Sequence, residues 1–386
     1  MSTAESTTQP RTLARAVEPS LDGETVLAVL RRTMLVSDAT VRRAKRRDDG
    51  ITLDGVRCKT NEIVRSGQIL SIVIDDEAGR DESAVEAEPG PLSIAYEDDD
   101  LLVIDKPAGL VVHPGPGHEN GTLCNFVAYH LRSSDGTGAA RPVQRLDRTT
   151  SGLVVFAKNA HAQDRLQRQM HTRDFERTYL AVCTGSPDPE SGVVDAPIVR
   201  ITRGPSVFAV RADGKRAVTR YETLARWSCA GPRGANGPGA GSASRIETAA
   251  GAGVAAGAGA GSASRVGVAA GAGTEGTSRI EAATAPEAGA GAEEGNEPET
   301  FSLVKLNLET GRTHQIRLHM RHIGCPLLGD ETYGTPSTII GRAALHSWRL
   351  RLTHPLTGAR IELACALPQD MRDALAGIGR SARCAL

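Results

Sequence analysis

Alternating apolar and polar residues dominate the chain from about residue 91 onward. LSIAYEDDDLLVIDKP (92–107) predicts two strands around a charged turn that we expect to be solvated, and GLVVFAK (152–158) predicts a buried strand. The same strand pattern recurs in ERTYLAVCTG (176–185), AVTRYETLARW (217–227), TFSLVKLNLE (300–309), LHSWRLRLTHP (345–355) and ARIELACAL (359–367). Because many of these runs follow one another as hairpins do, we expect an α+β fold with a mixed, largely antiparallel sheet.

Helical periodicity is confined to a few segments of this region. NAHAQDRLQRQMHTR (159–173) places Ala162, Leu166 and Met170 on one face behind Asn159, a good N-cap residue. RTHQIRLHMRHIG (312–324) has a similar apolar stripe and ends at a glycine. A short helix is expected at the C-terminus.

Residues 20–75 have the pattern of a small separate unit. Two short helices, the second capped by Ser37, precede the hairpin GITLDGVRC (50–58) and the strand SGQILSIVI (66–74). We expect a disordered tail over residues 1–19, an acidic linker over 76–90 and a large domain over 91–380.

Residues 229–299 have lost all periodicity and consist mostly of Gly, Ala, Ser and Glu. Such a composition cannot bury enough apolar surface to offset the entropy of ordering, so we expect a disordered insertion. Its two flanks read as strands, which predicts a hairpin with a very long loop. The segment carries four arginines and eight glutamates, and the rest of the chain carries 41 basic and 38 acidic residues.

Composition narrows the class of protein. The 386 residues are 40% hydrophobic and 24% charged, as in soluble globular proteins. No apolar run is long enough for a membrane span, and no signal-peptide core precedes the first unit. The seven cysteines are scattered, which favours reduced thiols in the cytoplasm over disulfides or a zinc site. We therefore expect a cytoplasmic protein, monomeric and not bound to membranes.

Several motifs in the large domain carry polar groups that packing does not explain. QRLDRTTSGLVVFAK (144–158) resembles the H-R-L-D-x-x-T-S/T-G-L signature of RluA/RluD-type pseudouridine synthases. The resemblance extends to IDKPAGLVVHPG (104–115), RTYLAVCTG (177–185), GKRAVTRYETL (214–224) and LETGRTHQIRLHMRHIGCPLLGDETYG (308–334). These motifs occur in the expected order over residues 91–375, outside the insertion. Residues 20–75 are similar to the S-four-type RNA-binding domain that often precedes this catalytic domain.

The resemblance implies an RNA uridine isomerase that has the α+β fold expected above and uses no metal or redox cofactor. Asp147 would be the nucleophile, Arg312 the cation whose planar fork holds that carboxylate, and Tyr179 the ring that packs on the target uracil and a candidate base for the carbon-5 proton. Arg145 would help displace the base from its stack. Further substrate contacts are expected from Arg177, Lys106 and Gln144. Attack on the sugar and attack on the ring both remain compatible with the sequence.

Plainer explanations exist for the same residues. A lone aspartate between two arginines is most often a surface ion pair, and it is the ordered set of motifs that favours catalysis. Gln144 stands where the family motif usually has histidine, so that position cannot carry a proton charge here. An RNA-binding or ribosome-assembly factor that has lost the chemistry is therefore the alternative. Three histidines on one predicted helix (His314, His319 and His322) are not spaced to converge on one metal ion.

A basic run follows Ser37 in the first unit, with five cations in six positions: Arg42, Arg43, Lys45, Arg46 and Arg47. Such a run is either a solvated helix face or a phosphate-binding surface, and beside the other motifs it favours RNA. The resemblance implies ribosomal RNA of the large subunit as the substrate, with transfer RNA as the second candidate.

Overall fold

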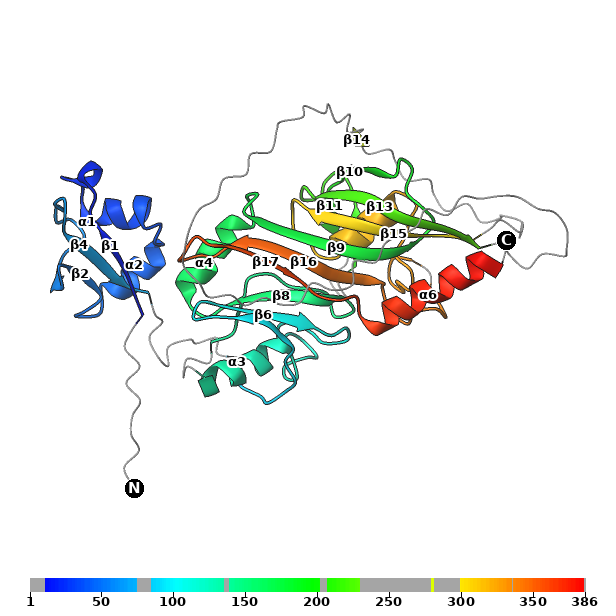
Figure 1. Ribbon diagram of the computed structural model, residues 1–386, viewed down its shortest axis with the longest axis horizontal. Coiled ribbons are helices and arrows are strands. Elements are labelled where there is room, and N and C mark those ends of the chain that lie inside the picture. Colours follow the sequence, from blue (N-terminus) through cyan, green and yellow to red (C-terminus); the bar gives the residue numbers. More distant parts are fainter. Residues whose placement is uncertain are drawn as a thin grey trace, which may run out of the picture.

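The computed structural model describes residues 11–74, 85–134, 139–201, 207–229, 279–280, 299–334 and 336–384. The described part comprises a small N-terminal unit (residues 11–74) and a large unit (residues 85–384), which Figure 1 shows as separate bodies. Residues 1–10 of the expected tail, most of the expected linker and nearly all of the expected insertion lie outside the described residues.

One mixed sheet forms the frame of the large unit. Its strands follow the order β14-β10-β13-β15-β9-β16-β8-β6-β5, with β17 paired to β16 and β7 paired to β8. Their bounds are β5 Ile94–Glu97, β6 Leu101–Lys106, β7 Arg141–Pro142, β8 Ser151–Ala157, β9 Phe175–Thr184, β10 Ser191–Asp195, β13 Val218–Cys229, β14 Arg279–Ile280, β15 Glu299–Leu308, β16 Leu345–Thr353 and β17 Arg360–Ala364. Among these described strands only the β10–β14 and β8–β16 pairs are parallel. The predicted α+β class with a largely antiparallel sheet is confirmed.

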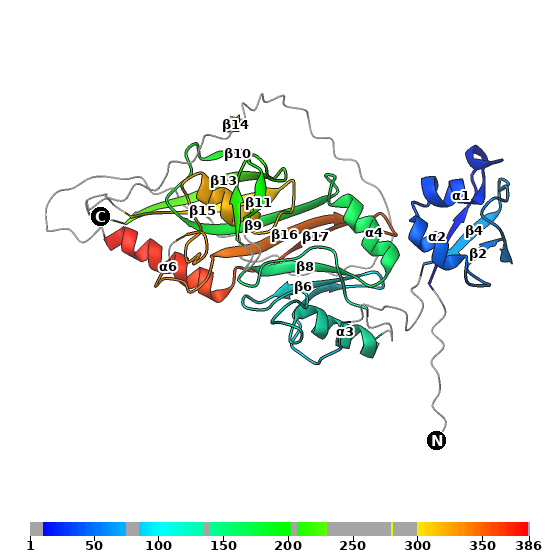
Figure 2. The same ribbon diagram turned by 180° about the vertical axis from the view of Figure 1, so that it is seen from behind.

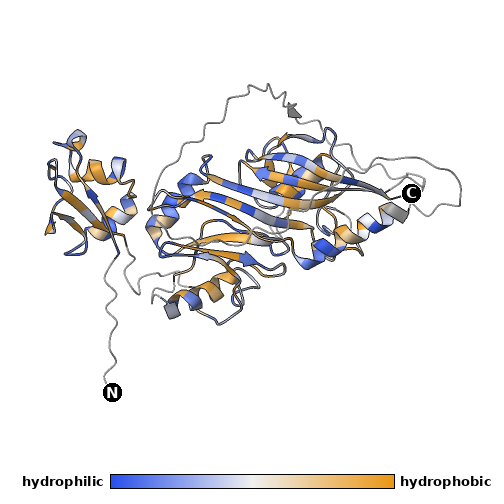
Figure 3. Cartoon of the chain, viewed as in Figure 1, coloured by the Kyte–Doolittle hydropathy of each residue, from blue (hydrophilic) through white to orange (hydrophobic). Residues whose placement is uncertain are grey.

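Helices and a small hairpin surround this sheet. They are α3 Leu123–Ser134, α4 Ala160–Gln169, α5 Gln315–His322, α6 Gln369–Cys384 and the strands β11 Ile198–Arg200 and β12 Phe208–Val210. Asn159 caps α4 as predicted, because its Oδ1 accepts a hydrogen bond from Ala162 N. Figure 2 shows α3 beside β6, and α6 at the far end of the unit. The hydrophobic colour of Figure 3 follows the inner strands and α3, in agreement with β8 being buried along its whole length.

The strands that flank the insertion pair as predicted. β13 and β15 are antiparallel out to Cys229 opposite Glu299. Cys229 and Glu299, the two ends of the long segment between these strands, therefore lie opposite each other at one hairpin end.

The N-terminal unit has its own four-stranded sheet in the order β1-β4-β2-β3 and its own apolar core. Its elements are β1 Thr12–Ala16, η1 Pro19–Leu21, α1 Val26–Ala28, η2 Val29–Thr33, α2 Asp38–Ala44, β2 Ile51–Leu53, β3 Val56–Arg57 and β4 Ile69–Val73. Ser37 caps α2, and Asp54 and Gly55 make the hairpin turn with positive φ angles, as predicted. The prediction of a disordered tail was wrong for residues 12–16, because β1 pairs along its whole length with β4.

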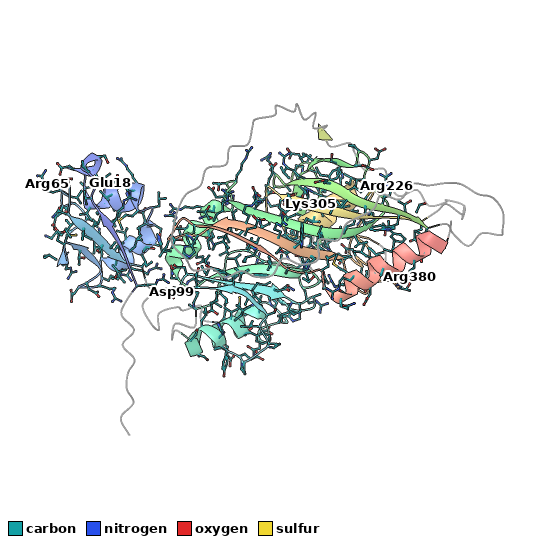
Figure 4. All side chains as sticks on the ribbon, in the orientation of Figure 1. Glu18, Arg65, Asp99, Arg226, Lys305 and Arg380 are labelled. Carbon is teal, nitrogen blue, oxygen red and sulfur yellow. The ribbon has the colours of Figure 1, made fainter. Side chains whose placement is uncertain are left out.

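The expected solvated turn after β5 is instead part of the contact between the two units. Asp100 is 3% exposed, and its carboxylate accepts hydrogen bonds from Arg11 Nη2 at 2.7 Å and from Asn159 Nδ2 at 2.8 Å. Leu356 of the large unit packs against the N-terminal core. Figure 4 labels Asp99 on the side of the large unit that faces the N-terminal unit, whereas Glu18 and Arg65 lie farther from that contact. A carboxylate whose partner is a residue of another unit cannot be recognised from local polarity.

Candidate active site

The loop that carries Asp147 is fixed at the point where it enters β8. The N–H of Thr150 donates to the carbonyl of Asp147 at 3.1 Å, which closes a tight turn. Gly152 has a φ of +106°, and a Cβ there would lie 2.2 Å from the carbonyl oxygen of Ser347. Only glycine allows this close approach of β8 and β16, so the glycine of the TSG sequence sets the position of the loop.

The buried Lys106 and the half-buried Arg342 hold the same loop from behind. Lys106 Nζ donates to the carbonyl oxygens of Pro107 and Leu110 at 2.8 and 2.9 Å, and lies 3.4 Å from that of Arg148. Arg342 Nη1 donates to the carbonyl of Thr149 at 3.0 Å. Lys106 is fully buried, so the structure places it beneath the loop and not on a surface that substrate can reach. Burial and the charge of Arg342 lower the pKa of Lys106 to about 7.

Asp147 itself is partly accessible and faces a guanidinium and an imidazole. Its side chain is 24% exposed. Arg317 Nη1 lies 3.5 Å and His314 Nε2 lies 3.9 Å from the same carboxylate oxygen, Oδ2. A carboxylate held on one oxygen by a guanidinium, with part of its surface open, can serve as a nucleophile.

Arg317 is fixed by a buried partner. Its Nε and Nη2 donate to the two carboxylate oxygens of Asp330 at 2.7 and 2.6 Å, and its guanidinium carbon lies 4.9 Å from the ring centre of Tyr333. Burial alone would raise the pKa of Asp330, but the hydrogen bonds and charge of Arg317 outweigh it and hold that pKa below its ordinary value. The Arg317 guanidinium therefore reaches Asp147 from a rigid two-point anchor.

Arg312, the brace expected from the motif, makes other contacts. Its side chain is exposed, its Nε donates to the carbonyl of Arg216 at 3.1 Å, and its backbone N–H donates to Gln315 Oε1. Both arginines belong to one motif, but Arg312 precedes α5 whereas Arg317 lies within it. The sequence did contain a signal for Arg317: it lies within a helix that carries an apolar stripe, and a buried arginine needs a carboxylate partner such as Asp330.

Tyr179 and Arg177 project from one face of β9 near this group. Tyr179 is 4% exposed and is paired with Leu306 on β15 and Ser347 on β16. Burial raises the pKa of its phenol, and the charge of Arg177 opposes that effect. Arg177 is also 4% exposed; its guanidinium carbon lies 6.0 Å from the ring centre of Phe175, and its Nε has no hydrogen-bond partner among the described residues. Its Nη1 lies where a Cβ on Gly311 would come within 3.2 Å.

Comparison with known proteins decides what kind of site this is. The family model described as RNA pseudouridylate synthase matches residues 100–322, more than half of the chain. The chain belongs to the RNA pseudouridylate synthase family. It is 33% identical over 328 residues to "Ribosomal large subunit pseudouridine synthase D" of Haemophilus influenzae, covering 81% of this chain and 78% of that protein. It is 32% identical to "Uncharacterized RNA pseudouridine synthase YlyB" of Bacillus subtilis, covering 87% and 88% of the two chains.

A solved structure, "Human RNA Pseudouridylate Synthase Domain Containing 4", aligns with 74% of this chain and 93% of its own at 21% identity. The TM-score of this alignment is 0.46. The sequence relatives establish the enzyme class: this protein is an RNA pseudouridine synthase, an isomerase that acts on RNA.

Two further residues of the synthase motif differ in accessibility. Arg145 is exposed, two positions before Asp147. Gln144 is 6% exposed, and its Nε2 reaches the carbonyl of Leu153 only at 3.5 Å, while its Oε1 finds no hydrogen-bond partner among the described residues. The position usually held by histidine is thus buried against the base of the loop in this synthase.

The basic run of the N-terminal unit divides into two groups in the structure. Arg42, Lys45 and Arg46 are exposed around the end of α2. Arg47 is half-buried and donates to both carboxylate oxygens of Asp49 at 3.0 and 3.2 Å. Arg43 is half-buried close to α4, where it adds to the effect of burial in lowering the pKa of His161 to about 4. The run therefore does not form a single free surface.

Proposed function

We propose that this enzyme converts specific uridines of large-subunit ribosomal RNA to pseudouridine, with Asp147 as the nucleophile. Support comes from relatives at 33% identity, including those of Haemophilus influenzae and Pseudomonas aeruginosa, that are named for this substrate. The observation that carries the chemical assignment is the Arg317–Asp147 pair, because it places a buried guanidinium 3.5 Å from a carboxylate that substrate can reach. A buried cation on one oxygen offsets the loss of water when a base enters the site.

The reaction breaks the bond between C1′ and N1 of the uridine and forms a bond between C1′ and C5. The C5 proton leaves, and N1 gains a proton, so no net oxidation occurs and no redox cofactor is needed. Asp147 forms a transient covalent bond to the nucleotide while the base turns. Arg317 takes the role that we had expected for Arg312, since it is the guanidinium within ion-pair distance.

Tyr179 is proposed to pack against the target uracil. Burial raises the pKa of Tyr179, so the phenol keeps its proton in the resting enzyme. The main role proposed for Tyr179 is therefore packing, and removal of the C5 proton is secondary. Arg177 stands beside it, and its Nε has no hydrogen-bond partner among the described residues, so we propose that it binds a polar atom of the flipped nucleotide.

The target nucleoside must leave its stack, because Asp147 cannot reach it inside a helix. The exposed side chains of Arg145, Arg148 and Arg312 are proposed to contact the backbone phosphates around the extruded base. Gln144 and Lys106, which we had expected to touch substrate, are instead proposed to support the loop from inside.

Residues 20–75 are proposed to be an S-four-like domain that adds affinity for RNA through Arg42, Lys45 and Arg46, with residues 91–380 as the catalytic domain. None of the helices in the described part of the chain combines the length and apolarity that a bilayer crossing requires. We further propose that the enzyme works as a monomer in the cytoplasm, where its ribosomal substrate is made.

The test is a site-resolved pseudouridine map of ribosomal and transfer RNA from a deletion strain. The strain is complemented with the wild-type gene or with Asp147→Asn. We expect defined large-subunit positions to disappear on deletion, to return with the wild type and to stay absent with the variant. A map that changes only in transfer RNA would overturn the proposed target. An unchanged map with defective ribosome assembly would overturn catalysis as the role.

A further inference from the structure

Tyr333, His314 and the backbone of β12 form a hydrogen-bonded chain that ends at the nucleophile. The N–H of Phe208 lies 3.2 Å from Tyr333 Oη, and the same oxygen lies 2.8 Å from His314 Nδ1. The other ring nitrogen of His314, Nε2, faces Asp147 Oδ2 at 3.9 Å. None of the roles assigned above uses this chain.

The hydrogens of this chain can be placed by accounting for donors and acceptors. A backbone N–H can only donate, so Tyr333 Oη accepts from Phe208. The hydroxyl then has its own hydrogen to place, and within the described residues His314 Nδ1 is the acceptor in reach. If Nδ1 carried the hydrogen, the phenol O–H would be left without a partner in a buried setting, which costs about 1–3 kcal/mol. His314 is therefore neutral, with its hydrogen on Nε2.

Donors and acceptors also determine the tautomer of His319, which lies on α5. Its hydrogen-bond partners differ from those of His314. Gln315 Nε2 donates to Thr219 Oγ1, and that hydroxyl donates to His319 Nδ1 at 2.9 Å. His319 Nε2 then donates to the carbonyl of Ala196 at 2.9 Å. His319 provides an internal reference because its Nε2 partner is a carbonyl and can only accept.

The backbone holds His314 in place for this purpose. His314 has φ +55° and ψ +21°, a left-handed conformation that non-glycine residues seldom adopt. Its ring makes edge contacts with Phe208 and Tyr333, at centroid distances of 5.7 and 5.4 Å. A strained residue clamped between two rings and directed at a nucleophile is typical of functional sites.

We propose that His314 is a positioning residue for Asp147, an uncharged Nε2–H donor whose tautomer is set by Tyr333. A movement of about 1 Å would bring Nε2–H within hydrogen-bond distance of Oδ2. Arg317 approaches the same oxygen, so both donors hold Oδ2 and Oδ1 is left to attack the nucleotide. The catalytic part of this inference rests on Asp147 being the nucleophile, whereas the tautomer does not.

The tautomer can be measured without RNA. Full-length protein labelled with ¹⁵N-histidine gives ring-nitrogen signals whose shifts and couplings report which nitrogen carries hydrogen. The His314 signal is assigned by its loss in His314→Gln. We expect Nε2–H for both His314 and His319 in the wild type. In Tyr333→Phe, the Nδ1 signal of His314 should move because its hydrogen-bond donor is lost, while the signals of His319 stay unchanged. A wild-type His314 with hydrogen on Nδ1, or no response to Tyr333→Phe, would overturn the inference.

Single-turnover kinetics test the role of the donor. His314→Ala should slow conversion by about a hundredfold, with RNA affinity changed less than about threefold. His314→Gln keeps an N–H near the position of Nε2 and should recover much of that loss. Two results would contradict a positioning role for His314. One is a loss of conversion that only follows the loss of folded protein in both variants, and the other is an equal rate for the Ala and Gln variants. If the wild type does not modify ribosomal RNA, the proposed substrate fails, yet the tautomer measurement still decides this inference.

Discussion

The loop around Asp147 and the basic end of α2 are both rich in charged side chains, but the two regions differ in how far those side chains are buried. Near Asp147 two basic side chains are buried and held at fixed points: Arg317 by Asp330, and Lys106 by three carbonyls. At the end of α2, Arg42, Lys45 and Arg46 are exposed. A buried charge needs a defined partner, whereas an exposed charge stays hydrated and its side chain stays conformationally free.

This difference indicates a division of labour. Fixed cations near the loop stabilise one geometry of one carboxylate, which chemistry requires. Exposed cations attract phosphates at many positions and release counterions, which gives salt-sensitive affinity without a fixed geometry. Changes in the first region should therefore affect rate, and changes in the second should affect binding.

Replacing Arg317 should give the largest effect. Arg317→Ala leaves Asp330 charged and buried without its partner, which costs about 3–5 kcal/mol of folding free energy. Arg317→Lys keeps a charge but loses the fork, so this variant should fold and still lose about 10²–10³-fold in single-turnover rate. The matched control is Arg312→Lys on the same segment, with a rate close to wild type. Equal losses in the two lysine variants would contradict the assignment of the brace.

Tyr179→Phe should have the next largest effect on rate. The ring that packs on uracil remains, so RNA affinity should hold. Loss of the hydroxyl should slow conversion by about a hundredfold, because we expect this hydroxyl to assist the C5 proton transfer. Binding and single-turnover rates are measured on the same RNA. A variant that binds poorly but reacts normally once saturated would refute this division.

The Arg317–Asp330 pair also predicts how stability responds to acid. The folded-state pKa of Asp330 lies below its ordinary value of 3.8, so the contribution of the pair is present above that pH and is lost as the pH falls through the lower folded value. Chemical denaturation between pH 6 and about pH 3 measures this. Asp330→Asn should be less stable at pH 6 and should show a shallower loss with acid. Parallel curves for the two proteins would show that the pair is not the source.

Removing the exposed charges of α2 should change binding more than rate. The triple variant Arg42→Ala, Lys45→Ala, Arg46→Ala should bind RNA more weakly, and the slope of log affinity against log salt should fall by about 2. The rate with saturating RNA should stay near wild type. Arg65→Ala, in the same unit but farther from the large unit in Figure 4, is the matched control. Unchanged salt dependence in the triple variant would remove α2 from the RNA interface.

Shortening the insertion should have the smallest effect. β13 and β15 pair out to Cys229 and Glu299, so a short glycine-serine turn in place of residues 231–297 can close the hairpin. We expect the melting temperature to stay within about 2 °C and the turnover to be preserved, because loop closure depends only weakly on length. A marked fall in melting temperature would show that the insertion stabilises the fold by more than the short pairing of β14 with β10.

Local signals in the sequence predicted much of the fold. Side-chain caps at Ser37 and Asn159 and the Asp54-Gly55 turn depend on neighbours a few residues away, so they could be read directly. β1 was missed because this short strand is mostly exposed and shows no apolar alternation. It forms only because β4 offers an edge to pair with.

The candidate site was predictable in its motif but not in its contacts. Asp147 stood out by its motif, yet the choice between Arg312 and Arg317 depended on Asp330, and the burial of Lys106 depended on carbonyls brought together by the loop. Asp100 was likewise assigned to solvent because its partner, Arg11, is 89 residues away. Buried polar groups are defined by distant partners, and a single sequence does not show which distant residues meet.

The most direct test of the account is release of tritium from RNA labelled at C5 of uridine, since that hydrogen must leave when C5 bonds to the sugar. Wild-type enzyme should release it from its target RNA, and Asp147→Asn should release none while binding that RNA with an affinity within about threefold of wild type. Release by Asp147→Asn at a rate close to wild type would show that another group attacks the nucleotide.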